Sequence, residues 1–176
     1  VPVAIKDAEG SWGLATEDEG RRPQTTMEDL AGLKTPFRPH GRVTAGTSSP
    51  LTDGATMSLL AGGAAVKEFG LAPKMRMVSF AFAGVQPEIM GIGPIPSTEK
   101  ALKKAGLTIA DIGLFELNEA FAIQVISLLD HFGIADDDPR VNQWGGAIAL
   151  GHPLAASGVR LMIQLAAQFA ERPDVR

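Results

Sequence analysis

The sequence predicts an α/β fold with layered packing, and two observations carry this prediction. Beyond Pro73, short β-prone apolar stretches alternate with stretches of helical apolar spacing, and such alternation is typical of domains built from packed layers of strands and helices. Apolar residues make up 45% of the 176 residues. This is the composition of a globular protein able to bury one good core or parts of two.

The first fifty residues predict a surface region with little core of its own. Residues 17–22 form a dense charged turn. Thr25 and Glu28 have the spacing of a capping box, which predicts a short helix through Leu33. Pro36 and the proline and glycine that follow it then break the chain.

A buried helix is expected next. Asp53 is placed to cap a helix that runs through Val66 and ends at Gly70. Because apolar residues cover nearly every face of this stretch, we expect the helix to be buried.

From residue 75 onward, strands and helices alternate. Apolar and β-prone residues predict strands at 75–83 and 112–117. Capping residues and apolar spacing predict helices at 97–106, 120–132 and 156–171. Thr108 and Asp111 predict one further capped turn.

Composition excludes several classes of protein. The net charge is −4 and there is no basic stripe, which argues against nucleic acid as the main partner. The sequence has no cysteine, which excludes a disulfide scaffold and a thiolate zinc site. No pair of histidines has metal-ligand spacing, so no metal is predicted. No apolar run reaches the ~18 residues that span a bilayer, and no signal peptide is recognisable.

Two polar interruptions of apolar sequence are candidates for chemistry. His152 lies in GGAIALGHP at 145–153, a run otherwise made of glycine and small apolar residues, and Pro153 fixes the chain direction after it. A histidine held in this way can have its pKa tuned for proton transfer. Asn118 and Glu119 lie in LNEAFA at 117–122, where the predicted strand passes into a helix.

In this order, the two motifs resemble those of the thiolases, enzymes that break or make a carbon–carbon bond beside a coenzyme A thioester. The resemblance covers nearly the whole chain from about Asp18. Three further stretches carry it: DEGR with TTME within 18–28, VTAGTSS at 43–49 and MGIGPIP at 90–96. It implies the layered αβαβα thiolase fold.

The chain departs from the family pattern at two positions and in its extent. The family commonly has asparagine where this chain has Thr47, and glycine where it has Ala155. Thiolases also carry a nucleophilic cysteine in their first half and a second cysteine near the C-terminus, and neither segment is present. The resemblance therefore implies an incomplete fold, the C-terminal half of a thiolase. Its expected parts are a loop-domain remnant at 1–50, a buried helical segment of the N-terminal half at 51–72, and a C-terminal domain lacking its last strands at 73–176.

The resemblance also assigns roles to individual residues. His152 would accept the thiol proton of the nucleophilic cysteine. Together with a water held by Asn118, it would stabilise the enolate oxygen of the thioester, and one such donor contributes ~3 kcal/mol to lowering the barrier. The implied contacts to substrate and coenzyme A are Ser49, Met90, Phe121 and Gly151.

Simpler structural roles stay open for several of these residues. Asn118 could cap the helix that follows it, and Ser49 could be an ordinary turn residue. Met90 and Phe121 could belong to the core. Glu119 is interpreted as structural, orienting its neighbours.

The resemblance implies a fragment of an acyltransferase that cleaves 3-ketoacyl-CoA to acetyl-CoA and a shortened acyl-CoA, or runs the reverse Claisen condensation. The alternative is a non-catalytic CoA-binding or assembly subunit that kept the scaffold. Coenzyme A would be a substrate, and no cofactor is expected. Expected partners are CoA thioesters, a second copy in a homodimer or homotetramer, and a subunit of a β-oxidation complex. A cytoplasmic location is expected, with an organelle as the alternative.

Overall fold

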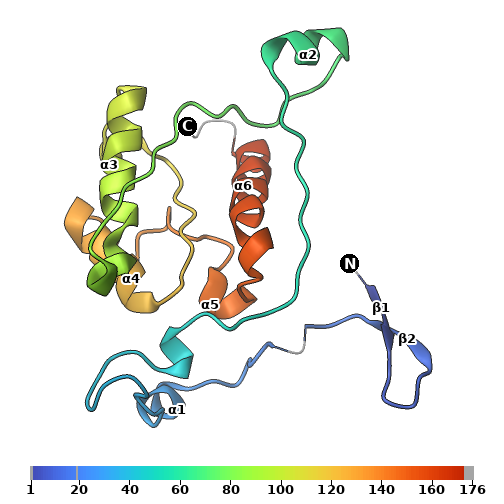
Figure 1. Ribbon diagram of the computed structural model, residues 1–176, viewed down its shortest axis with the longest axis vertical. Helices are drawn as coiled ribbons and strands as arrows, with labels where there is room; N and C mark the ends of the chain where they lie inside the picture. The colour runs from blue at the N-terminus through green and yellow to red at the C-terminus, as the bar shows by residue number, and fades with distance from the viewer. Residues whose placement is uncertain (1, 19, 173–176) are drawn as a thin grey trace. The chain divides into compact units, whose positions relative to one another are not determined.

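The computed structural model describes residues 2–18 and 20–172, which separate into two compact units, Val1–Gly32 and Leu33–Arg176 (Figure 1). In the first unit, β1 (Val3–Lys6) and β2 (Trp12–Ala15) form an antiparallel hairpin in which Val3 pairs with Ala15. Gly10 has a φ of +87° in the connecting turn, a conformation that glycine adopts without strain.

The first helix, α1 (Met27–Ala31), begins one residue later than the sequence predicts. Its capping box is formed by Thr26 and Asp29, so the predicted pairing of Thr25 with Glu28 is wrong. Both pairs have the required spacing, but the hydroxyl of Thr25 donates instead to the carbonyl of Arg22 at 3.0 Å. The choice between them therefore depends on the preceding turn.

The buried helix predicted from Asp53 is also wrong over most of its length. Residues 52–62 have no regular secondary structure, and the helix is limited to α2 (Gly63–Glu68). Met57 is 89% exposed and Leu59 is 81% exposed. A short apolar helix gains most of its stability from tertiary packing, and the described residues provide little to pack against it. The domain boundaries at residues 50 and 72 stay a prediction.

The second unit is organised around three longer helices: α3 (Pro94–Ala105), α4 (Ala122–Phe132) and α6 (Leu154–Glu171). Shorter turns of helix are η1 (Ala45–Thr47), η2 (Pro87–Ile92), η3 (Ile109–Asp111) and α5 (Ala147–Leu150). The three predicted helices are confirmed, although α3 begins at Pro94 rather than Ser97, because proline is well suited to a first helical position. The capping box of Thr108 and Asp111 is confirmed as well.

The core of this unit is formed by α4 and by residues that precede and follow it. Phe115, Leu128, Leu129 and Ile134 form the buried cluster. Both α3 and α4 end at glycines in the left-handed conformation, Gly106 and Gly133, where a side chain would be strained. No described helix has the length and apolarity needed to cross a membrane.

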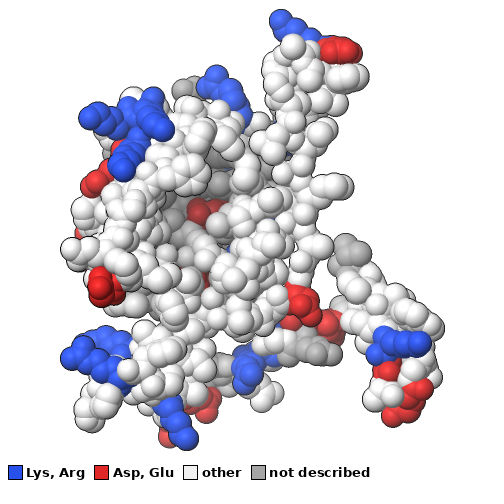
Figure 2. Space-filling view, viewed as in Figure 1, with Lys and Arg blue, Asp and Glu red and all other residues white. Residues whose placement is uncertain are grey.

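The two predicted strands have an extended backbone but almost no hydrogen-bonded pairing with other described strands. Segment 75–83 pairs with no described strand, and its carbonyl at Phe80 instead accepts a hydrogen bond from Lys104 Nζ at 2.9 Å. Figure 2 shows basic side chains gathered over the C-terminal end of α3, whose last turn contains Lys103 and Lys104. Within 112–117 there is one parallel bridge, from Phe115 to Val141. A strand exists only through its neighbour, so its formation depends on pairing partners and not on propensity alone.

Candidate functional site

One extended segment, residues 48–51, joins the two motifs that the sequence singled out. At one end, Ser48 forms an antiparallel bridge with Phe121, and Ser49 donates its backbone N–H to the carbonyl of Ala120 at 3.1 Å. At the other end, Leu51 forms a parallel bridge with His152, whose N–H donates to the carbonyl of Pro50 at 3.0 Å. The structure therefore places both motifs along the same short stretch of backbone.

Two glycines allow the chain to come this close. A Cβ at Gly151 would lie 2.6 Å from Thr52 Oγ1, and its φ of +97° also disfavours a side chain. A Cβ at Gly54 would lie 2.7 Å from Cγ of Pro153, a rigid ring that cannot move aside. Gly151 thus has a packing role, while its contact with substrate stays a prediction.

His152 is half-buried and its ring is oriented by a serine of α6. Nδ1 lies 2.7 Å from Ser157 Oγ, and Ser157 is 2% exposed. The hydroxyl also donates to the carbonyl of Pro153 at 3.2 Å. When it does so, Oγ accepts from Nδ1–H, which leaves Nε2 as the proton acceptor. This arrangement suits a general base.

Ser157 was not predicted as part of this site. Sequence reasoning placed it at the start of the last helix, whereas α6 already begins at Leu154. Its position five residues after His152, in the first turn of a helix, is the signal that would have found it.

Asn118 lies in the loop that leads to α4. The N-cap of α4 is Phe121, so the alternative that Asn118 caps this helix is wrong. Asn118 Oδ1 is buried and has no hydrogen-bond partner among the described residues. A buried carbonyl oxygen normally accepts a hydrogen bond, so this atom is suited to accept one from a bound water or a substrate group.

The residues on both sides of Asn118 are held by Asn142, which the sequence reasoning did not single out. Asn142 Oδ1 accepts from the N–H of Leu117 at 2.7 Å, and Nδ2 donates to the carbonyl of Leu117 at 3.1 Å and to Glu119 Oε1 at 2.6 Å. The second carboxylate oxygen of Glu119 accepts from the N–H of Ile148 at 3.1 Å. Glu119 orients its neighbours, as the sequence predicts.

The two carboxylates that flank Asn118 point to different helices. Glu119 reaches α5, whereas Glu116 accepts from Gln168 Nε2 of α6 at 2.6 Å. Burial raises the pKa of Glu116 above its usual value, and the hydrogen bond from Gln168 and the charge of Arg160 oppose this rise. A carboxyl in this position is costly to ionise.

The other residues predicted to contact substrate or coenzyme A do not all lie at the joined motifs. Ser49 Oγ donates to the carbonyl of Ala120 at 3.3 Å, so Ser49 lies at the joined motifs. Phe121 is half-buried there. Met90 lies on η2, which packs against α4, and is 75% exposed, so it is not a core residue of the described chain. The roles of Ser49, Met90 and Phe121 toward substrate stay predictions.

A hollow of about 400 Å³ lies beside this region. It is bounded by Glu119, by the apolar side chains of α4 and by the glycines at 145 and 146. Neither His152 nor Asn118 lines it, so the joint stabilisation of an enolate oxygen that the resemblance assigns to these two residues stays a prediction. Among the described residues, no three carboxylate or imidazole side chains gather as a metal ion would require.

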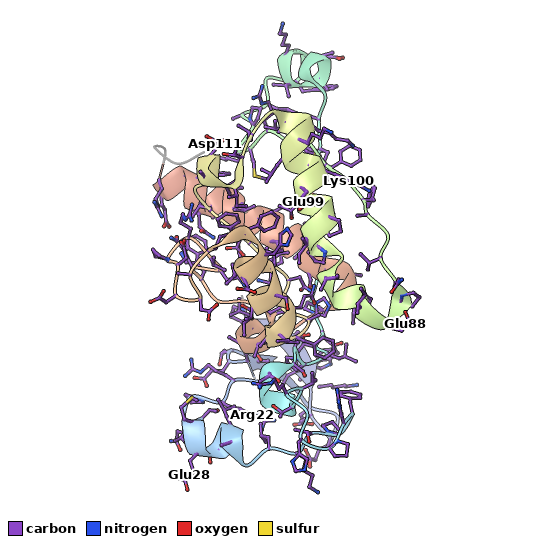
Figure 3. The ribbon with its side chains drawn as sticks, turned by 90° about the vertical axis from the view of Figure 1, so that its left-hand side faces the viewer. Arg22, Glu28, Glu88, Glu99, Lys100 and Asp111 are labelled. Atoms are coloured by element: carbon purple, nitrogen blue, oxygen red, sulfur yellow. The ribbon has the colours of Figure 1, made fainter. Side chains whose placement is uncertain are left out.

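A bond outside the site links α3 and α4. Glu99, labelled on α3 in Figure 3, lies 2.9 Å from His131 Nε2 in the last turn of α4. His131 thus has a carboxylate partner in addition to its favourable position in the last turn of the helix.

Comparison with known proteins identifies the class. The sequence model of the family "Thiolase, C-terminal domain" matches residues 71–175, and that of "Thiolase, N-terminal domain" matches residues 1–63. The chain therefore belongs to the thiolase family.

Particular relatives extend this assignment. The chain is 46% identical over 172 residues to the 3-oxoadipyl-CoA/3-oxo-5,6-dehydrosuberyl-CoA thiolase of Escherichia coli K12, covering 98% of this chain and 43% of the relative. It is 52% identical over 167 residues to a 3-ketoacyl-CoA thiolase of Marinomonas sp. strain MWYL1, covering 94% and 43%. The chain thus spans less than half the length of these relatives.

Solved thiolase structures also match nearly the whole of this chain and less than half of their own length. The crystal structure of the Bacillus anthracis acetyl-CoA acetyltransferase matches with a TM-score of 0.86 at 39% identity, covering 98% of this chain and 43% of that one. Human mitochondrial 3-ketoacyl-CoA thiolase in complex with CoA matches with a TM-score of 0.81 at 40% identity, covering 91% and 40%. The described chain has the α/β thiolase fold in incomplete form.

Proposed function

We propose that the protein containing this chain cleaves 3-ketoacyl-CoA with free coenzyme A, giving acetyl-CoA and a shortened acyl-CoA, or runs the reverse condensation. The observation that carries this proposal is the backbone junction at residues 48–51, which joins the Asn118 motif to His152. The names of the relatives support the reaction class, since they are 3-ketoacyl-CoA and 3-oxoadipyl-CoA thiolases.

His152 carries the proton transfer in this proposal. Its ring, held at Nδ1 by Ser157, offers Nε2 to the thiol of a nucleophilic cysteine. That cysteine comes from outside this sequence, which contains none. The cysteine thiolate attacks the keto carbon, the C2–C3 bond breaks, and the shortened acyl group stays on the cysteine until free coenzyme A removes it. The electron pair of the broken bond passes to the acetyl-CoA enolate, whose thioester oxygen carries the new negative charge until a second cysteine protonates the enolate carbon. His152 and a water held by Asn118 stabilise this oxygen.

Coenzyme A is a substrate in this proposal, and no cofactor takes part. The match to a solved thiolase in complex with CoA supports CoA thioesters as ligands. We further propose that the protein forms a homodimer or homotetramer and lies in the cytoplasm. In the same proposal it works with a partner subunit in β-oxidation, a part of lipid metabolism. Exposed apolar side chains at Val78, Phe80 and Phe82 support burial of segment 75–83 against further protein.

Turnover by variants of the complete protein tests the reaction. His152→Ala should lower kcat by about 10²- to 10⁴-fold while KM changes little, because proton transfer and enolate stabilisation belong to the transition state. Asn118→Ala should cost less, up to about 100-fold, because water can partly replace the amide. The measurement is release of acetyl-CoA from a 3-ketoacyl-CoA in the presence of free coenzyme A.

His131→Ala is the matched control, because this imidazole pairs with Glu99 between α3 and α4 and should not affect kcat. Near wild-type turnover by His152→Ala would refute the proposed chemistry. A complete protein that binds coenzyme A without any turnover would instead support a non-catalytic CoA-binding subunit.

A further inference from the structure

Glu119 uses both of its carboxylate oxygens to connect two separate parts of the chain. Oε1 accepts from Asn142 Nδ2 at 2.6 Å, and Oε2 accepts from the N–H of Ile148 at 3.1 Å. Ile148 is the second residue of α5, and the first N–H groups of a helix have no partner within the helix. Gly146, the N-cap of α5, offers no side-chain cap, so Glu119 supplies it from another element.

The space for this carboxylate is made by a glycine. A Cβ at Gly146 would lie 1.9 Å from both Cδ and Oε1 of Glu119. The φ of Gly146 is −103°, a conformation open to any residue, so the glycine is required here for space and not for backbone freedom.

Asn142 fixes the other side of the loop. Its backbone has a φ of +43°, which asparagine tolerates better than most residues, and its amide bonds both the N–H and the carbonyl of Leu117. This pair of bonds continues the alignment that begins at the Phe115–Val141 bridge. The residues before and after Asn118 are therefore both anchored to Asn142.

The same carboxylate also acts on His152. α5 is a single turn, closed by the bond from the N–H of Gly151 to the carbonyl of Ala147 at 2.9 Å, and His152 follows directly. Holding the start of α5 therefore restrains the backbone from which His152 projects.

We infer that Glu119 is a positioning residue that fixes Asn118 and His152 relative to one another, through Asn142 on one side and α5 on the other. This inference rests on the proposed thiolase reaction. Donors preorganised for a developing oxyanion lose their effect when displaced by a fraction of an ångström. Loss of the two hydrogen bonds to Glu119 should therefore affect the transition state more than substrate binding.

Glu119→Gln in the complete protein is the primary test. The substitution keeps the shape, but the introduced NH₂ group must face either Asn142 Nδ2 or the N–H of Ile148, and both of these are donors. We expect kcat to fall about 10- to 100-fold, with KM changed less than about threefold. Glu116→Gln is the matched control, since it makes the same change three positions earlier on a side chain that contacts α6, and kcat should be unchanged.

The double variant Glu119→Gln/Asn142→Asp separates positioning from general loss of structure. The introduced carboxylate can accept from the introduced amide, but the atom that donates to the carbonyl of Leu117 becomes an acceptor. Asn142→Asp is therefore measured alone as well, and kcat of the double variant should exceed the value that the two single losses predict when combined. Amide hydrogen exchange at Ile148 gives a readout independent of activity, and exchange should be faster in Glu119→Gln.

The outcomes are distinguishable. A wild-type protein without thiolysis refutes the proposed function, and the positioning role falls with it. Active wild type with unchanged kcat in Glu119→Gln, or with a change in KM alone, refutes only the positioning role. Unchanged exchange at Ile148 refutes the bond to α5.

Discussion

Gly146→Ala tests whether the two hydrogen bonds accepted by the Glu119 carboxylate contribute to the free energy of unfolding. The new methyl group would overlap the Glu119 carboxylate, which lies 1.9–2.2 Å from the Cβ position. Because the backbone at Gly146 is unstrained for alanine, the methyl is accommodated by moving Glu119 away. The bonds from Asn142 and Ile148 are then lost.

The magnitude follows from these two bonds. A hydrogen bond to a charged group contributes roughly 1.5–3 kcal/mol. Glu119 is half-buried, so water recovers part of the loss once the side chain has moved. We expect Gly146→Ala to lower the free energy of unfolding by roughly 3 kcal/mol.

Urea denaturation of the complete protein measures this change. Gly106→Ala is the comparison, because Gly106 has a φ of +68° and no neighbouring atom within 4 Å, so it should cost only the left-handed strain of about 1 kcal/mol. In a Glu119→Ala background, Gly146→Ala should cost little, because the group it displaces is gone. A full cost in that background, or a cost no larger than that of Gly106→Ala, would refute the reasoning.

Two further predictions concern pH. Burial raises the pKa of Glu116, so its favourable contribution is complete below the ordinary value of 4.5 and is lost as pH rises through the raised value. Urea unfolding should show the stability of wild type falling relative to that of Glu116→Gln over that range, and a constant difference between the two would contradict this. The hydrogen bonds from Arg140 lower the pKa of Asp138 to about 2, so its contribution is present above the ordinary value of 3.8 and is lost as pH falls toward 2. The difference in stability between wild type and Asp138→Asn should therefore shrink over that interval, and a constant difference would exclude this pair as its source.

Helices were the part of the fold that the sequence could predict. Apolar spacing located α4 and α6, and the predicted end of α3 at Gly106 is confirmed by the left-handed backbone of that glycine. Such features depend on residues within a few positions of one another, so they can be recognised locally. The motifs around Asn118 and His152 were likewise sufficient to indicate the family.

Features that depend on distant partners could not be predicted in this way. The segment at 53–62 has a helical apolar pattern but is extended, because the packing surface that would bury a helix is not among the described residues. The choice of Thr26 over Thr25 as cap depended on where Thr25 found its own partner.

The candidate site likewise has features that the sequence indicates and features that only the folded chain shows. Sequence alone singled out the residues that are proposed to carry the chemistry, His152 and Asn118. Only the tertiary structure decided that residues 48–51 join their two motifs, that Ser157 orients the imidazole, and that Asn142 and Glu119 hold the loop. Each of these is a hydrogen bond or bridge between separate elements, and its geometry exists only once the chain has folded.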